Sequence, residues 1–151
     1  MCESVLADDN RTLSSFCDFY DRFAAQKGLE MLDRSGLVRY ASSGVLDLSQ
    51  AKDPDGEVVV WHAHLLTQKR VRLLYSASLF RETEDNQRRN LIGRANRYLH
   101  WGDMLRFRTT GLSLYDFGGW YPGDTDDALL RINKFFAILI SRFPSSEKRK
   151  H

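Results

Sequence analysis

An acidic residue inside an otherwise apolar stretch is the first feature that points to chemistry. Asp116 lies near the end of a short predicted strand, two residues before a pair of glycines. A buried carboxylate is costly unless it is paired, and glycines at a strand end let a ligand approach the backbone closely. Open α/β sheets bind ligands at the carboxyl ends of their strands. Asp116 is therefore a candidate general base, with Tyr115 beside it as a further catalytic candidate; the alternative is that Asp116 pairs with a loop or with an arginine such as Arg94.

Two histidines share one face of a second predicted strand. In the segment Trp61-His62-Ala63-His64, the alternation of a strand places both imidazoles on the same side. A neutral imidazole can take a proton from an amine at pH 7, so His62 is a second candidate base. No metal site is expected, because no third ligand follows at a useful spacing and neither cysteine is near in sequence. The alternative is that both histidines only pack.

A basic segment could hold a phosphate. Residues 69–108 carry ten basic and four acidic side chains, whereas residues 1–68 carry six and eleven. Gly93 is expected near a helix start, and the free N–H groups there suit a pyrophosphate. The candidate phosphate-binding residues are Arg89, Gly93, Arg94, Ala95 and Asn96. The alternative is that Gly93 permits close packing and that the arginines form a solvated face.

The elements that must position these residues follow from hydrophobic period and turn signals. Helices are expected at 13–32, 90–110 and 128–140, and strands at 45–49, 57–67, 71–80 and 112–117. Gly28 should interrupt the first helix, Ser35-Gly36 should form a turn, and residues 36–43 should be a short strand or loop. This order predicts an α/β fold whose mixed sheet has an antiparallel meander followed by a strand–helix–strand crossover.

Length and composition set the remaining bounds. The 151 residues, 42% apolar and 28% charged, suit one domain over residues 1–144 with a polar, basic tail at 145–151. The net charge of +2 does not by itself indicate nucleic acid. The two cysteines are read as reduced thiols, no secretory signal or membrane span is expected, and the expected compartment is the cytoplasm.

In this order, the elements and motifs resemble the GNAT-type acyltransferase fold, and within it the bacterial branch that includes the Fem-type peptidoglycan aminoacyltransferases. Residues 93–101 and 115–119 are the most specific part of the resemblance, which covers residues 16–136. It implies that the strand backbone at Ser76, Ser78 and Leu79 orients an acyl donor. It also implies that Arg89 and residues 93–96 hold the phosphates of acetyl-CoA or another acyl-CoA. Fem-type enzymes use aminoacyl-tRNA on a similar scaffold without that loop, so both donors stay open.

The resemblance sets the expected function. An acyl group would move from a thioester or aminoacyl ester to the amine of a small molecule or cell-wall precursor, with Asp116 or His62 removing the proton. After residues 132–136 the Fem-type glycines and strands are missing, so the sheet should have an open edge at which two copies could pair. The alternative function is a non-catalytic module of the same fold that binds a partner protein or a nucleotide-bearing ligand.

Overall fold

The computed structural model describes residues 2–5 and 9–117. These form five strands, three α-helices and a short 3₁₀ helix, in the chain order β1 (Cys2–Val5), α1 (Asn10–Lys27), α2 (Arg34–Ser42), β2 (Leu46–Lys52), β3 (Val58–Leu66), β4 (Arg70–Ser78), η1 (Leu79–Glu82), α3 (Asn86–Thr109) and β5 (Leu114–Asp116). The helix predicted at 128–140, the predicted lack of further C-terminal strands and the basic tail all concern residues outside the described part of the chain.

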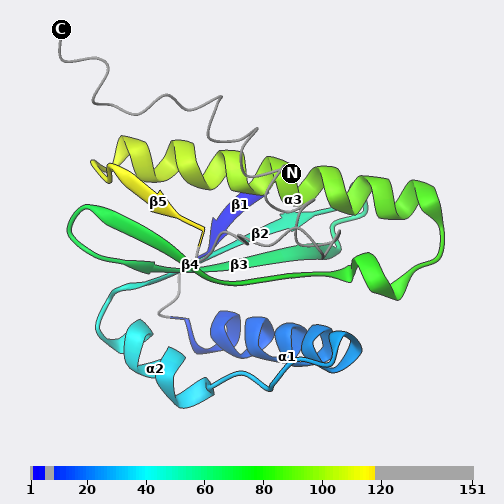
Figure 1. Cartoon of the computed structure of the whole chain (residues 1–151), viewed down its shortest axis with the longest axis horizontal. Helices are drawn as coiled ribbons and strands as arrows, with labels where there is room; N and C mark the ends of the chain where they lie inside the picture. Colours follow the sequence, from blue (N-terminus) through cyan, green and yellow to red (C-terminus); the bar gives the residue numbers. More distant parts are fainter. Residues whose placement is uncertain (1, 6–8, 118–151) are drawn as a thin grey trace, which may run out of the picture.

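The strands form one mixed sheet in the order β1-β2-β3-β4-β5. The strands β1 to β4 pair with one another in antiparallel fashion. After the crossover through α3, β5 pairs with β4 in parallel. In Figure 1, α3 covers one face of the sheet, and α1 and α2 cover the other. The predicted α/β class, meander and crossover are confirmed, and β1 is a strand that the sequence analysis missed.

The first helical segment ends earlier than predicted, and a second helix follows it. Asp9 caps α1 by accepting a hydrogen bond from the Arg11 N–H, and α1 ends at Gly28, whose φ of 70° is the left-handed conformation that glycine adopts readily. The turn and strand or loop predicted for residues 35–43 are wrong, because α2 forms there. Asp33 provides the cap, accepting hydrogen bonds from the Gly36 N–H at 3.0 Å and the Ser35 hydroxyl at 2.9 Å.

Apolar side chains fill both interfaces between the helices and the sheet. On the α1 side, the buried Phe16 ring packs edge-on against Trp61 with 5.8 Å between ring centroids. On the α3 side, a second apolar cluster contains Ala51, Val59, Val60, Leu79, Ile92 and Leu99. Along the α3 side, however, the apolar contacts give way to polar ones toward the middle of the helix. No helix in the described part of the chain is long and apolar enough to cross a membrane.

Candidate active site

The open half of β4 is the first element of the site. β5 pairs with β4 only at Arg70, Val71 and Arg72, whereas β4 continues to Ser78. A register shift opposite Ala63 and His64 adds a bulge to the pairing of β3 with β4. Within residues 2–5 and 9–117, the later half of β4 therefore pairs with β3 alone. The backbone N–H and C=O groups on its other edge can bind an extended chain.

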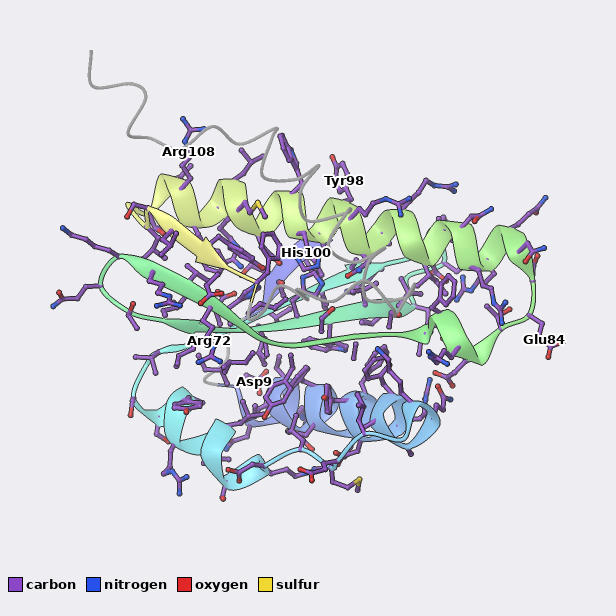
Figure 2. All side chains as sticks on the ribbon, in the orientation of Figure 1. Asp9, Arg72, Glu84, Tyr98, His100 and Arg108 are labelled. Carbon is purple, nitrogen blue, oxygen red and sulfur yellow. The ribbon has the colours of Figure 1, made fainter. Side chains whose placement is uncertain are left out.

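Beside this edge, β3 presents His62 to α3. The His62 side chain is fully buried and has polar partners at both ring nitrogens. Its Nδ1 lies 2.9 Å from Asp103 Oδ2, and its Nε2 lies 2.7 Å from Asn96 Oδ1. The His100 ring stacks on it with centroids 4.0 Å apart. Figure 2 shows His100 between α3 and the sheet, whereas Tyr98 lies on the outer side of the same helix.

His64 continues this buried cluster toward β2 and β5. Its Nε2 makes a 2.8 Å hydrogen bond with the Tyr115 hydroxyl and lies 3.6 Å from Asp103 Oδ2. Its Nδ1 faces Asp47 Oδ2 at 3.4 Å. Four elements thus meet at this histidine: β2, β3, α3 and β5. We call His62, His64, His100 and their polar partners the histidine cluster.

An arginine of α3 closes the histidine cluster. Arg106 donates two hydrogen bonds of 2.7 Å to the two carboxylate oxygens of Asp47. It also donates a 3.3 Å hydrogen bond to Asp103 Oδ1. Bidentate arginine–carboxylate pairs are geometrically specific and strong. Arg106 therefore ties both carboxylates of the cluster, and with them β2, to α3.

Burial sets the protonation of three groups in the cluster. Removal from water lowers the pKa of His64, although the nearby Asp47 opposes this shift. Burial also lowers the pKa of His100 well below its ordinary value. Burial raises the pKa of Tyr115 well above its ordinary value, and the Asp103 charge adds to the effect. At pH 7 both histidines are therefore neutral, and Tyr115 retains its proton.

The structure separates the predicted catalytic residues. Tyr115 joins His62 in the histidine cluster through His64. Asp116 pairs instead with Arg70, and its side chain remains 26% exposed. The predicted alternative of an arginine partner is thus confirmed, although the arginine is Arg70 rather than Arg94.

The helix start predicted at Gly93 is wrong. α3 begins at Asn86, with Asp85 as its cap, so Gly93 lies about two turns inside the helix. There the backbone N–H groups are bonded within the helix and cannot bind phosphate. Of its predicted neighbours, Asn96 contacts His62, Ala95 packs in the apolar cluster and Arg94 is exposed.

The true start of α3 does not fit a pyrophosphate. Residues 79–86 contain no glycine, and three of them, Glu82, Glu84 and Asp85, are acidic. Arg88 is held by Asp53 at 2.6 Å and Glu57 at 2.8 Å. Arg89 donates to a backbone carbonyl and lies over a phenylalanine ring. Arg88 and Arg89 at this helix start are thus used in contacts within the protein, and the free amides lie among carboxylates.

Sequence reasoning missed most of the histidine cluster. Asn96, His100 and Asp103 recur at the spacing of one helix face, which is a signal that the sequence contains. No metal was expected because His62 and His64 lacked a third ligand in sequence. Asp103, 41 residues after His62, is brought to them by the crossover.

The comparisons with known proteins find matches in structure and none in sequence. No protein-family model and no curated protein matches the sequence. Among solved structures, a probable acetyltransferase matches with a TM-score of 0.63 and 8% identity over 92% of this chain and 87% of that one. FemX matches with a TM-score of 0.67 and 15% identity over 90% of this chain and 49% of that one. An aminoglycoside acetyltransferase from an uncultured soil metagenomic sample, in complex with sisomicin, matches with a TM-score of 0.60 and 11% identity over 89% and 84% of the two chains. At these identities the likeness shows the fold.

Proposed function

Because the chain has the GNAT-like acyltransferase fold, we propose that it transfers an acyl group from an activated ester or thioester to an amine. The open half of β4 carries this proposal. Where β5 stops pairing after Arg72, the backbone of β4 continues to Ser78 with one edge free among the described residues. An extended acyl donor can complete that edge as an added strand would. The small side chains of Ser76 and Ser78 leave room beside it, and Leu79 marks its end.

Two donors share this chemistry, acyl-CoA and aminoacyl-tRNA. In the arrangement predicted from sequence, the pyrophosphate of CoA would lie at the start of α3. The acidic residues there disfavour such a donor. Aminoacyl-tRNA needs no such loop, and the basic excess of residues 69–108 suits a polyanion. FemX shares the fold, which supports this second donor, although membership in the Fem-type branch stays a prediction.

Asp116 is the better candidate for the base. It is the last residue of β5, where the pairing of β5 with β4 ends, and its side chain is partly exposed. A carboxylate at this position can accept a proton from an attacking amine. His62 is fully buried, with both ring nitrogens engaged, so it can only position other groups. Tyr115 has the same role through its hydrogen bond with His64.

The acceptor is proposed as the amine of a small molecule or a cell-wall precursor. A small-molecule acceptor is supported by the aminoglycoside acetyltransferase that shares the fold. Pairing of two copies at an open sheet edge and a cytoplasmic location stay predictions.

The test measures donor binding and acyl transfer separately. The purified chain is titrated with acetyl-CoA and with charged tRNA in a thermal-shift assay, and transfer to a panel of amines is then followed. We expect a saturable rise in melting temperature with one of the two donors. Asp116→Asn should lower turnover about 100-fold without weakening donor binding. Asp55→Asn, an exposed carboxylate in the β2–β3 turn, is the matched control. Donor binding without transfer would favour the non-catalytic module, and no binding of either donor would contradict the proposal.

A further inference from the structure

Three buried side chains of the histidine cluster offer metal-ligand atoms around one point. One ligand atom from each of His62, His64 and Asp103 lies within 4.8 Å of the others. Asp103 Oδ2 is 2.9 Å from His62 Nδ1 and 3.6 Å from His64 Nε2. Around a zinc ion, bonds of about 2.0–2.2 Å place tetrahedral ligand atoms about 3.3 Å apart. The observed separations lie on either side of that value, so small side-chain movements would complete the geometry.

The other polar atoms of these ligands face groups of the kind that usually surround metal ligands. His62 Nε2 meets the carbonyl oxygen of Asn96 at 2.7 Å, which leaves Nδ1 directed at Asp103. On the far side of the second ring, His64 Nδ1 faces Asp47. The second oxygen of Asp103 accepts a hydrogen bond from Arg106. Carbonyl or carboxylate groups on the outer ring nitrogen are the common second shell of metal-bound histidine.

The charges of the histidine cluster also favour a cation. Asp47 and Asp103 have side chains that are 14% and 2% exposed, and among the described residues Arg106 is the one arginine or lysine that pairs with them. Two carboxylates thus share one guanidinium, and an uncompensated buried charge is costly. A cation between the histidines and Asp103 would remove that cost.

We propose that His62, His64 and Asp103 bind one divalent transition-metal ion that joins β3 to α3. Two imidazoles and a carboxylate, without a thiolate, suit Zn²⁺ or a similar first-row ion. The Tyr115 hydroxyl, 2.8 Å from His64 Nε2, is a further oxygen beside this group. Because the three ligands are buried, the ion stabilises the fold and does not contact a substrate. The ion would be bound whether or not the chain transfers an acyl group.

The test uses the full chain after removal of metal with a chelator. Zn²⁺ is added in competition with a chromophoric chelator, and Co²⁺ is added separately because its absorption reports ligand number. We expect one ion per chain, a saturable rise in melting temperature, and a four- or five-coordinate Co²⁺ spectrum. Asp103→Asn and His64→Gln should each weaken Zn²⁺ binding at least tenfold. Asp103→Asn retains the shape of the side chain but removes its negative charge.

Ser49→Ala is the matched control, because Ser49 is buried in register with His62 but is not a ligand. It should bind Zn²⁺ as the wild type does. Circular dichroism of the metal-free variants checks that they fold; if they do not, the wild-type stoichiometry and Co²⁺ spectrum decide. A wild-type chain that binds no stoichiometric ion, holding a proton between His62 and Asp103 instead, would overturn the proposal. Equal binding by all the variants would overturn it as well, since the ion would then lie elsewhere on the chain.

Discussion

At the scale of the residue, Arg106 connects the two carboxylates of the histidine cluster. It makes a bidentate pair with Asp47 on β2 and also contacts Asp103 on its own helix. Both carboxylates are shielded from water, so they rely on the Arg106 guanidinium for a compensating charge. Removal of one partner of a buried ion pair costs more than the pair itself contributes.

Arg106→Ala should therefore lower the free energy of unfolding by about 3 kcal/mol, because it leaves a buried carboxylate uncompensated. Arg108 is an exposed arginine two residues further along the same helix. Arg108→Ala should change the free energy of unfolding by less than about 0.5 kcal/mol. Urea unfolding of both variants at pH 7 measures the difference. Equal effects of the two substitutions would mean that Arg106 makes no buried pair.

Asp53 makes stability depend on pH in the acid range. The hydrogen bond from Arg88, followed by that from the Glu57 N–H, lowers the pKa of the Asp53 carboxyl. A carboxyl whose pKa is lower in the folded chain stabilises the fold above its unfolded pKa of about 3.9. That contribution is lost as the pH falls below this value, through the folded pKa.

The difference in stability between the wild type and Asp53→Asn should therefore shrink between pH 7 and pH 3. Chemical denaturation at several pH values gives this difference directly. Asp55→Asn, in the same turn but exposed, should show no such convergence. A difference that is constant with pH would show that Asp53 stabilises the turn only through its shape.

At the scale of the element, α3 determines where each of its residues can act. Gly93 lies inside the helix, and an added Cβ there would meet only the Arg97 Nη1 atom, at 3.7 Å. Gly28, by contrast, ends α1 with a φ of 70°. The two glycines therefore respond oppositely to the same substitution.

Gly93→Ala should raise the free energy of unfolding by about 0.5–1 kcal/mol, since alanine favours a helix interior. It should also leave donor binding unchanged. Gly28→Ala should lower the free energy of unfolding by about 1–2 kcal/mol, because the left-handed conformation strains any other residue. Thermal unfolding with and without donor tests both. Loss of donor binding in Gly93→Ala would restore the phosphate role that the sequence suggests.

At the scale of the whole molecule, β3 is the centre of the sheet. It pairs with β2 and β4 along its length, and its Val59, Val60 and Ala63 side chains are fully buried. β1 and β5 are short strands that pair on one side among the described residues. The histidine cluster attaches β3 to α3 on one face, and the apolar contacts of α1 cover the other.

Hydrogen exchange should follow this arrangement, with the amides of β3 protected longest and those of β1 and β5 exchanging first. Mass spectrometry of peptic fragments after timed deuterium labelling measures the order. Protection of β5 equal to that of β3 would indicate that β5 has a further partner strand. Addition of Zn²⁺ should slow exchange in β3 and α3 if the proposed ion joins them.

Much of the sheet and the face each strand exposes could be predicted from local sequence. Alternation and turn residues were enough for β2, β3 and β4, and the Asp53-Pro54-Asp55-Gly56 turn forms where expected. The shared face of His62 and His64 was also readable, because a strand alternates its side chains. The α2 helix was missed, since its cap, Asp33, precedes a glycine that resembles a turn signal.

Which faces meet depends on the packing of the elements against one another. Periodicity indicates that Asn96, His100 and Asp103 share a face of α3, but it does not say what that face contacts. The crossover from β4 to β5 places α3 over β3, and this brings Asp103 within 2.9 Å of His62. Gly93, in contrast, lies in a helix interior because the local cap at Asp85 begins α3 earlier than expected. Local patterns arise from neighbours in sequence, whereas the histidine cluster depends on the packing of four elements, and that packing decides which predicted site residues act together.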